Sequence, residues 1–187
     1  GNHLLLSGNT EVRTYLDRVG GSKFLTGPEA AVYPFVNLEN QQRWVIDISE
    51  GRFPWWLFSA KRRVPGSFPA DYLKAYKLRS ARATESVGDV LDDGGMLFKA
   101  FWEPLTVSLL NTPASNAAAS LLWAVISETL CKGGEHCRPL VARDGLSETF
   151  VDPALSYLKK NDVKICYNAR LREIKFVGNS AVNLLFN

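Results

Sequence analysis

The apolar residues near the start of the chain recur with the period of an α-helix. Between residues 10 and 20, one helical face carries four of them: Val12, Tyr15, Leu16 and Val19. This spacing of three and four residues predicts an amphipathic helix. Gly20 and Gly21 follow directly, and a glycine pair at this place predicts the end of the helix.

A different pattern follows after residue 30. Residues 31–38 and 43–48 are rich in Val, Ile, Tyr, Phe and Trp, and they flank the polar stretch 39–42. Two such runs around a short polar loop predict an antiparallel β-hairpin. Pro34 has no backbone N–H to donate, so we expect the first strand at a sheet edge or at a bulge.

The middle of the chain, residues 54–129, carries mostly helical patterns. The predicted pieces are a short segment at 54–63, a helix at 69–79 and a capped turn from Ser86 to Leu91. The following run is apolar on nearly every side of a helix, as is typical of a buried one. It covers residues 96–113, and Pro104 should kink or divide it.

A second apolar helix is predicted next. Thr112 is a favourable N-cap, and Pro113 suits the first helical position. The glycine pair that begins at Gly133 supplies the predicted end.

The last third of the chain groups one helix with short strands. Residues 147–160 predict an amphipathic helix, and three strands are predicted at 163–166, 171–177 and 181–186, the last two joined across 178–179. Helices and strands are grouped along the chain and do not alternate regularly. This order favours the α+β class over a doubly wound sheet.

Composition narrows the class of protein. The chain has 187 residues, of which 46% are apolar, and a formal charge of +3. So small a basic excess does not indicate nucleic acid, which requires a concentrated basic face. No apolar run approaches the ~20 residues of a membrane span, and no leader peptide is recognisable. We therefore expect a soluble or peripheral protein.

The cysteines suggest no metal centre. Cys131, Cys137 and Cys166 are an odd number without the spacing of a disulfide framework, which favours reduced thiols in the cytoplasm. Cys131, His136 and Cys137 lie close together in the sequence. A structural zinc site needs a second pair of ligands that the sequence does not offer. Ordinary loop thiols are the preferred interpretation, and no metal is predicted.

The segment Phe53–Arg63 combines large aromatic residues with cations. Its candidate membrane-interface residues are Trp55, Trp56, Lys61, Arg62 and Arg63. The alternative is a short helix that packs its aromatic rings into the core and exposes its charges to water. Both interpretations remain open at the level of the sequence. No Gly-x-Gly-x-x-Gly or Walker loop is present to hold a nucleotide phosphate.

The stretch FWEPLTVSLLNTP, Phe101 to Pro113, resembles a known family. A Trp-x-Pro-Leu segment that runs into Leu-Asn-Thr-Pro is similar to one in the squalene-associated FAD-dependent desaturases, or hydroxysqualene dehydroxylases, of the flavin amine oxidase and phytoene desaturase superfamily. PLVARDGLSETFVDPALSYLKKNDVKI resembles the family's return segment. The opening GNHLLLSGN resembles its Asp-Asn-Gly-x-His-Leu block. The resemblance extends over the whole chain, which covers only the middle of the family's length.

The resemblance implies a fold and a set of domains. We expect residues 1–145 to form the substrate-binding domain of a flavin amine oxidase-like protein, with helices and a β-hairpin. Residues 146–187 would return toward an FAD-binding domain whose Rossmann segment lies outside this sequence. The chain would then be an internal fragment, inactive without that segment.

The resemblance also implies site residues. Gly1, Asn2 and His3 fall where the family's block passes near the flavin, and Leu171 matches a position whose backbone meets the adenine. The motif residues Trp102, Pro104 and Leu105 are expected to line a substrate channel. No general acid is assigned, because Glu103 could equally be a carboxylate on the helix face.

The implied function is FAD-dependent dehydroxylation or desaturation of a polyisoprenoid such as hydroxysqualene, in hopanoid or isoprenoid biosynthesis. An apolar channel can bind such a substrate without a charged anchor. The expected protein is cytoplasmic, with peripheral contact to the inner face of the membrane and no nucleic-acid partner. The alternative is a non-catalytic module that binds lipid or a partner protein. A third interpretation is a flavin monooxygenase or amine oxidase relative that acts on another substrate.

Overall fold

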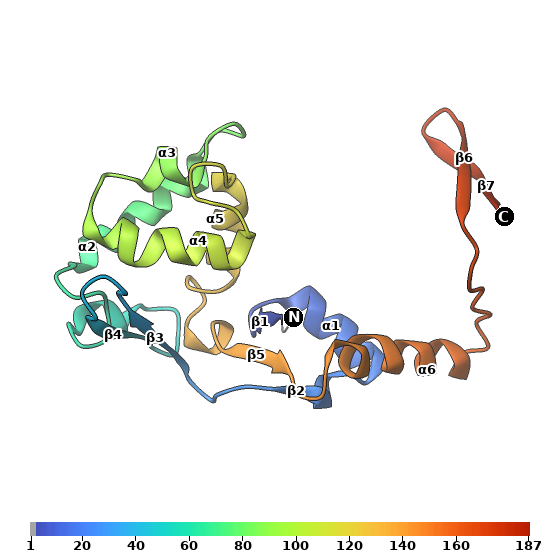
Figure 1. Cartoon of the computed structure of the whole chain (residues 1–187), viewed down its shortest axis with the longest axis horizontal. Coiled ribbons are helices and arrows are strands. Elements are labelled where there is room, and N and C mark those ends of the chain that lie inside the picture. Colours follow the sequence, from blue (N-terminus) through green and yellow to red (C-terminus); the bar gives the residue numbers. More distant parts are fainter. Residues whose placement is uncertain (1–2) are drawn as a thin grey trace.

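Short antiparallel strands organise the chain in three places (Figure 1). The computed structural model describes residues 3–187, and within them β5 lies between β1 and β2, β3 pairs with β4, and β6 pairs with β7. The strands are β1 (Leu4–Leu6), β2 (Leu25–Thr26), β3 (Ala31–Val36), β4 (Arg43–Ile48), β5 (Pro139–Ala142), β6 (Leu171–Val177) and β7 (Ser180–Phe186). The hairpin predicted at 31–48 is confirmed, with Pro34 opposite Val45.

Helices fill most of the space between these strands. The α-helices are α1 (Thr10–Val19), α2 (Pro69–Tyr72), α3 (Val87–Leu91), α4 (Glu103–Leu110), α5 (Ala119–Glu128) and α6 (Asp152–Lys160). The 3₁₀-helices are η1 (Ser22–Phe24), η2 (Trp55–Phe58), η3 (Leu73–Ser80) and η5 (Gly134–His136). The π-helical turns are η4 (Phe98–Trp102) and η6 (Ser147–Val151). The chain is thus mixed α/β and compatible with the predicted α+β class. Among the described helices, none has the length and apolar character needed to cross a bilayer.

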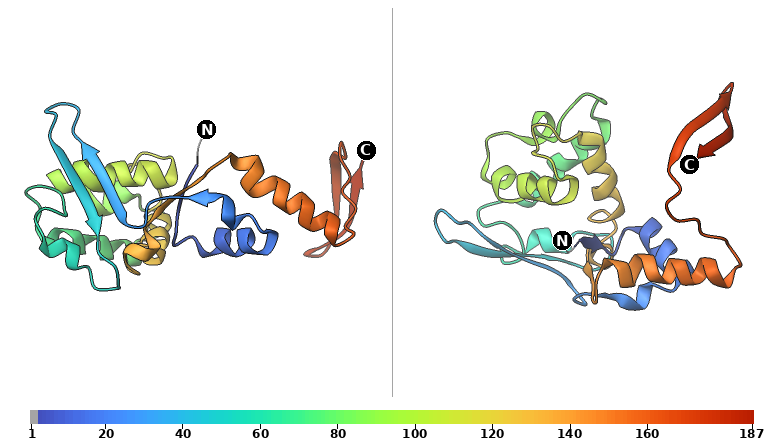
Figure 2. Two further views of the ribbon diagram at one scale, coloured as in Figure 1. Left: turned by 90° about the horizontal axis from the view of Figure 1, so that it is seen from below. Right: turned by 45° about the vertical axis from the view of Figure 1, so that its right-hand side comes forward.

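Helix α1 forms where its apolar spacing predicts it and packs beside α6 (Figure 2). The Asn9 side chain accepts the Val12 N–H at the start of the helix, and Gly20 ends it in the left-handed conformation. Tyr15 joins α1 to η6, the turn ahead of α6, because its hydroxyl donates to the Phe150 carbonyl at 2.7 Å. These two helices and the β1–β5–β2 sheet lie between the β3–β4 hairpin and the β6–β7 hairpin (Figure 1).

The apolar run predicted at 96–113 is helical without a break from 96 to 110, and its geometry changes immediately ahead of Pro104. Before the proline, η4 is a turn of π-helix in which the Glu103 N–H donates to the Phe98 carbonyl, five residues back. After it, α4 continues with ordinary helical geometry. Proline cannot donate, and its ring would clash with the carbonyl four residues earlier. We attribute the wider π turn to relief of this clash.

A π turn ahead of a proline occurs a second time in the chain. The sequences Phe101–Pro104 and Phe150–Pro153 share the order Phe, any residue, acid, proline. In the second, η6 is again a π turn, and α6 begins immediately before the proline. In both places, therefore, a π turn is followed by an α-helix that has a proline in its first turn.

The predicted helix start at Thr112 is wrong, because α5 begins only at Ala119. Backbone pairing with another segment holds the intervening chain out of a helix. The Val87 N–H donates to the Ala117 carbonyl at 2.8 Å, and the Ala119 N–H donates to the Glu85 carbonyl at 3.0 Å. These long-range hydrogen bonds outweigh the local capping signal.

Helix α5 also ends early, at Glu128, ahead of the predicted stop at Gly133. Gly133 instead brings two loops into contact. Its φ is 103°, and a Cβ there would lie 2.3 Å from the Gly51 carbonyl oxygen. The Glu135 carboxylate accepts the Gly51 N–H across the same contact.

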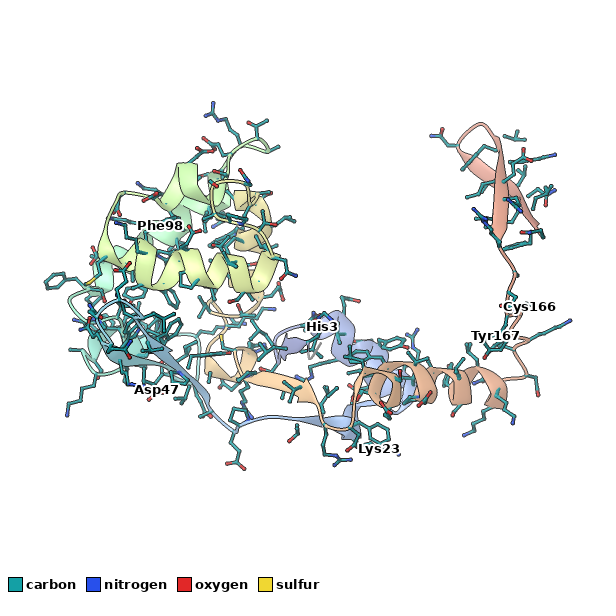
Figure 3. All side chains as sticks on the ribbon, viewed as in Figure 1. His3, Lys23, Asp47, Phe98, Cys166 and Tyr167 are labelled. Carbon is teal, nitrogen blue, oxygen red and sulfur yellow. The ribbon has the colours of Figure 1, made fainter. Side chains whose placement is uncertain are left out.

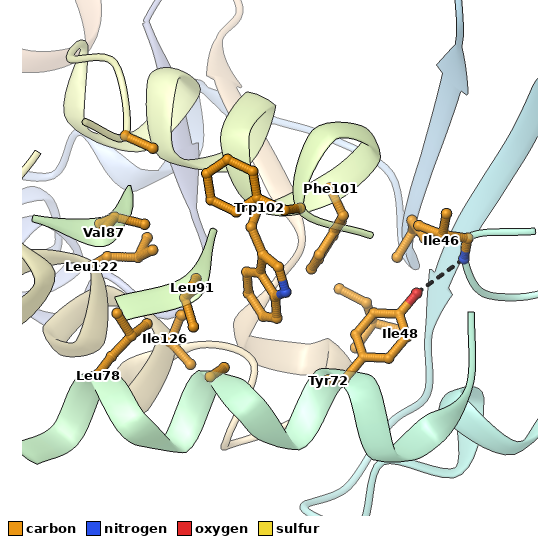
Figure 4. Close-up of a cluster of buried hydrophobic side chains, with 14 of the residues drawn as sticks. Ile46, Ile48, Tyr72, Leu78, Val87, Leu91, Phe101, Trp102, Leu122 and Ile126 are labelled. Carbon is orange, nitrogen blue, oxygen red and sulfur yellow. Dashed lines mark hydrogen bonds between the residues drawn. The ribbon is translucent and has the colours of Figure 1, made fainter. Parts of the chain in front are cut away.

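One hydrophobic core joins the β3–β4 hairpin to the segment from η2 to α5, and these elements together form the helical lobe (Figures 3 and 4). Figure 3 shows Phe98 inside this lobe. The larger buried members are Ile46, Ile48, Trp56, Leu57, Tyr72, Leu78, Leu91, Phe98, Phe101, Trp102, Leu122 and Ile126. Core and lobe therefore coincide with the apolar middle of the sequence.

The β6–β7 hairpin stands apart from this lobe (Figure 1). All of its residues are exposed, and no strand forms at 163–166, where the sequence predicts one. That segment belongs to the link 161–170, which joins α6 to the hairpin. A strand needs a neighbouring strand for its backbone, and none pairs with 163–166 among the described residues.

Candidate functional site

Trp102, the first predicted channel residue, lies in a buried group of three aromatic side chains (Figure 4). Its ring centroid is 4.8 Å from that of Phe101 and 6.3 Å from that of Tyr72. The Tyr72 hydroxyl accepts the Val64 N–H at 3.0 Å, and burial raises the pKa of Tyr72. A neutral tyrosine held in this way fixes the position of the Trp102 ring.

A pocket of about 150 Å³ opens beside Trp102. Apolar and charged side chains share its wall, and Lys74 contacts Asp93 there with 2.5 Å between Nζ and Oδ2. The hydrogen bond from Lys74 holds the pKa of Asp93 below its ordinary value. Ligand pockets usually measure about 300–1,000 Å³, so this pocket is too small to enclose a long isoprenoid.

The other motif residues lie one turn further along. Pro104 and Leu105 are half-buried on α4, Leu105 packs against the core, and neither lines the pocket. The Glu103 carboxylate accepts the Ala114 N–H at 3.4 Å and so contacts the turn ahead of α5. This contact gives Glu103 a place in the packing of the lobe. Whether the motif residues line a channel stays a prediction.

The predicted cofactor residues do not come together in the described chain. Gly1 and Asn2 lie outside the described residues. His3 is exposed immediately before β1 (Figure 3), whereas Leu171 begins β6 in the separate hairpin. Helix α6 and the link 161–170 separate the two positions (Figure 1). Their role at a flavin stays a prediction.

The connection from β1 to α1 offers no space for a phosphate. Its backbone N–H groups are already used, since Ser7 donates to the Arg138 carbonyl at 2.9 Å and Gly8 donates to the His136 carbonyl at 2.8 Å. A Cβ on Gly8 would lie 2.6 Å from the same His136 oxygen. This glycine serves close backbone packing and does not form a phosphate-binding loop of the dinucleotide kind.

Leu171 is exposed at the start of β6, next to an irregularity in the strand pairing. Leu171 pairs with Phe186, but the next pair is Glu173 with Leu185, so a β-bulge falls at Arg172. A bulge leaves its extra residue outside the ladder of backbone hydrogen bonds. The residue left outside the ladder is therefore Arg172, next to the position that the resemblance assigns to the adenine, and Leu171 itself is paired.

The structure separates the candidate membrane residues into two groups. Trp55 and Lys61 are exposed, Trp55 by 64%. The prediction is corrected at Trp56, which is only 4% exposed and packs in the core with its ring centroid 5.3 Å from that of Tyr72. A buried indole cannot enter a lipid headgroup layer.

The two arginines of this segment have structural partners. Arg62 pairs with Asp47 at 2.7 Å, and the Arg63 guanidinium donates to the Leu57 and Ser67 carbonyls at 2.6 and 2.9 Å. These bonds fix the loop after η2. Sequence reasoning also did not assign Phe53 and Phe58 as interface residues, although both are exposed. Trp55 and Phe58 are three residues apart, and this spacing could have indicated that both lie on one face of a short helix.

The cysteines lie apart from any group of metal ligands. Residues 3–187 contain no cluster of three or more His, Cys, Asp or Glu side chains suited to a metal ion. All three cysteines are free thiols, and burial raises the pKa of Cys137 to about 12. The Tyr33 hydroxyl donates to the Cys137 carbonyl and connects β3 to this loop.

These features define a mixed α/β protein with an apolar helical lobe, whose described residues include no phosphate loop. Comparison with curated proteins then indicates the family. The chain is 43% identical to the hydroxysqualene dehydroxylase of Zymomonas mobilis over 186 residues, which is 100% of this chain and 45% of that protein.

Two further relatives carry the same name. The hydroxysqualene dehydroxylase of Sinorhizobium fredii is 42% identical over 93% of this chain and 42% of its own length. That of Rhodopseudomonas palustris is 38% identical over 100% of this chain and 44% of its own length. The chain is therefore related to the hydroxysqualene dehydroxylases along its whole length, and the predicted resemblance is confirmed.

The chain spans less than half the length of these curated relatives. No model of a protein family matches it. No solved structure matches it either.

Proposed function

We propose that this chain forms the substrate-side part of an FAD-dependent oxidoreductase that converts hydroxysqualene to squalene. The observation that carries the proposal is the 38–43% identity to three hydroxysqualene dehydroxylases along the chain. Such identity over so much of the chain supports a shared fold and a related substrate. The apolar lobe is consistent with a polyisoprenoid, which needs little beyond buried apolar surface for affinity.

The overall reaction replaces a hydroxyl group by hydrogen. The substrate takes up a hydride and a proton and releases water, and a bound reduced FAD would supply the hydride and be left oxidised. The part of this chain is to bind the isoprenoid and to exclude water from it. Trp102, Pro104 and Leu105 are the residues we assign to the substrate side, with Trp102 held rigidly by its aromatic neighbours.

The cofactor side is assigned to two places. Gly1, Asn2 and His3 would lie toward the flavin ring, and the backbone at Leu171 would contact the adenine. The N–H groups of Ser7 and Gly8 in the β1–α1 connection are already bonded. The pyrophosphate would therefore be held by residues outside this connection. This proposal includes a flavin amine oxidase-like fold and a cytoplasmic location for the whole protein.

A second candidate function is a non-catalytic module that binds lipid or a partner protein. The exposed β6–β7 hairpin favours it. Its outward apolar residues include Ile174, Phe176, Val177, Val182, Leu184 and Phe186. A two-stranded hairpin is marginally stable by itself, so a covering surface would stabilise it.

The deciding measurement is the visible spectrum of the protein purified from the complete reading frame that contains this chain. We expect flavin bands near ~450 nm that are bleached by a reductant. Conversion of hydroxysqualene to squalene by the reduced protein, followed by gas chromatography, would then test the substrate. A colourless protein of full length would refute the flavoenzyme and leave the binding module as the function to test.

A further inference from the structure

Three aromatic rings lie together on the surface at η2. Phe53, Trp55 and Phe58 expose 51%, 64% and 62% of their surfaces. The Phe53 ring centroid is 4.2 Å from that of Trp55 and 5.9 Å from that of Phe58. We call these three residues the surface aromatic cluster. Contiguous exposed apolar surface of this kind marks an interaction site more often than scattered single residues do.

Local backbone geometry holds the cluster in place. Pro54 has φ −81° and ψ 64°, and the Trp55 N–H donates to the Phe53 carbonyl at 2.8 Å, which forms an inverse γ-turn. Side chains three residues apart on a 3₁₀-helix share a face, so Phe58 follows Trp55 outward. Trp56 and its neighbour Leu57 point inward and anchor the turn in the core.

Two exposed cations flank the cluster along the chain. Arg52 precedes Phe53 directly, and Lys61 comes three residues after Phe58. Neither forms an ion pair with any other residue between 3 and 187. The neighbouring acidic side chains are Glu50, which is exposed, and Glu135, which accepts the Gly51 N–H.

We propose that the surface aromatic cluster, with Arg52 and Lys61, docks on the headgroup region of an anionic lipid bilayer. Aromatic rings concentrate at membrane–water interfaces, and unpaired cations are attracted to anionic lipids. A protein partner fits less well, because protein interfaces are depleted in lysine and need a much larger apolar patch.

The docking surface is connected to the pocket beside Trp102 through one side chain. The Arg63 guanidinium donates both to Leu57 in η2 and to Ser67 in the pocket wall. A bilayer at the cluster would therefore lie close to the proposed substrate side. The inference rests on the proposed function in this respect, since a polyisoprenoid dissolves in the bilayer.

Co-sedimentation with vesicles tests this proposal on the protein from the complete reading frame. We expect binding to vesicles of equal parts phosphatidylcholine and phosphatidylglycerol, and much weaker binding to phosphatidylcholine alone. Trp55→Ser combined with Phe58→Ser should lower the partition coefficient by about tenfold or more, because two large apolar side chains are lost from the interface. Arg52→Gln and Lys61→Gln should each lower it about fivefold at low salt.

Tyr167→Ser is the matched control. Tyr167 is as exposed as the cluster residues but lies in the link before the β6–β7 hairpin (Figure 3), so its loss should leave binding unchanged. Circular dichroism and thermal unfolding would establish that each variant is folded. The charge variants give an independent measurement that does not alter the apolar surface.

The outcomes separate this inference from the proposed function. Unchanged binding of the Trp55→Ser/Phe58→Ser variant would overturn the docking surface, as would absent binding of the unaltered protein or an equal loss in the Tyr167 control. Turnover is measured separately, with hydroxysqualene dispersed in detergent. Vesicle binding without flavin or turnover would uphold the docking surface and refute the enzyme. Flavin and turnover without vesicle binding would uphold the enzyme and refute the docking surface.

Discussion

Leu121 and Leu122 are adjacent on α5 but have opposite environments. Leu122 is fully buried, with 0% of its surface exposed, whereas Leu121 is 58% exposed. Leu122→Ala should lower the free energy of unfolding by about 2–5 kcal/mol, since it removes buried methyl groups and leaves a cavity. Leu121→Ala, the matched control, should change it by less than about 0.5 kcal/mol. Urea unfolding would measure both, and equal effects would contradict the orientation of α5.

The pKa of Cys137 predicts how stability depends on alkaline pH. Burial raises this pKa from 9.0 to about 12, and burial raises the pKa of Tyr33 in the same direction. Because the unfolded chain loses these protons at lower pH than the folded one, stability is fully present below pH 9 and falls as the pH rises toward 12.

The measurement is the urea midpoint at several pH values between 8 and 11, a window set by the Cys137 pKa shift. Cys137→Ala should make the fall with pH less steep, and Tyr33 should account for part of the remainder. Cys166→Ala is the control, because that thiol is exposed in the link. A midpoint independent of pH in this window would refute the buried neutral thiol.

At the scale of one element, α3 depends on Ser86, the N-cap residue directly before it. The Ser86 hydroxyl accepts the Asp89 N–H at 3.1 Å, and the Asp89 carboxylate accepts the Ser86 N–H at 2.9 Å. Ser86→Ala should destabilise the protein by about 1 kcal/mol, since one N–H at the start of α3 loses its partner. Ser120→Ala on α5 is the control, because Ser120 is exposed. Thermal unfolding would detect the difference, and identical midpoints would argue against the capping box.

At the scale of the whole molecule, we expect this chain by itself not to retain FAD. The two proposed cofactor positions lie at separate places in the chain, and the β1–α1 connection is filled by its own hydrogen bonds. The test is gel filtration after incubation with FAD, with absorbance near ~450 nm as the readout of the flavin. The protein from the complete reading frame is the positive control. Stoichiometric retention by this chain would show that our division of the cofactor site is wrong.

The sequence alone determined those elements whose stability comes from local pattern. Helix α1, the β3–β4 hairpin and the helix over 147–160 appear where their apolar spacing and turn residues predict them. A disturbance of the helix at Pro104 was equally predictable, because a proline affects its own helix in any surroundings, although the π turn that accommodates it was not. The family could also be recognised, since its motifs are continuous in sequence.

Tertiary structure decided what depends on distant partners. Strand β5 forms because β1 and β2 lie on either side of it, and α5 starts late because Ala117 and Ala119 bond to the segment at 85–87. Trp55 and Trp56 are the same residue type side by side. Only the direction of one helical turn against the core exposes the first and buries the second. Composition cannot predict that direction, because it is set by contacts with residues far away in the sequence.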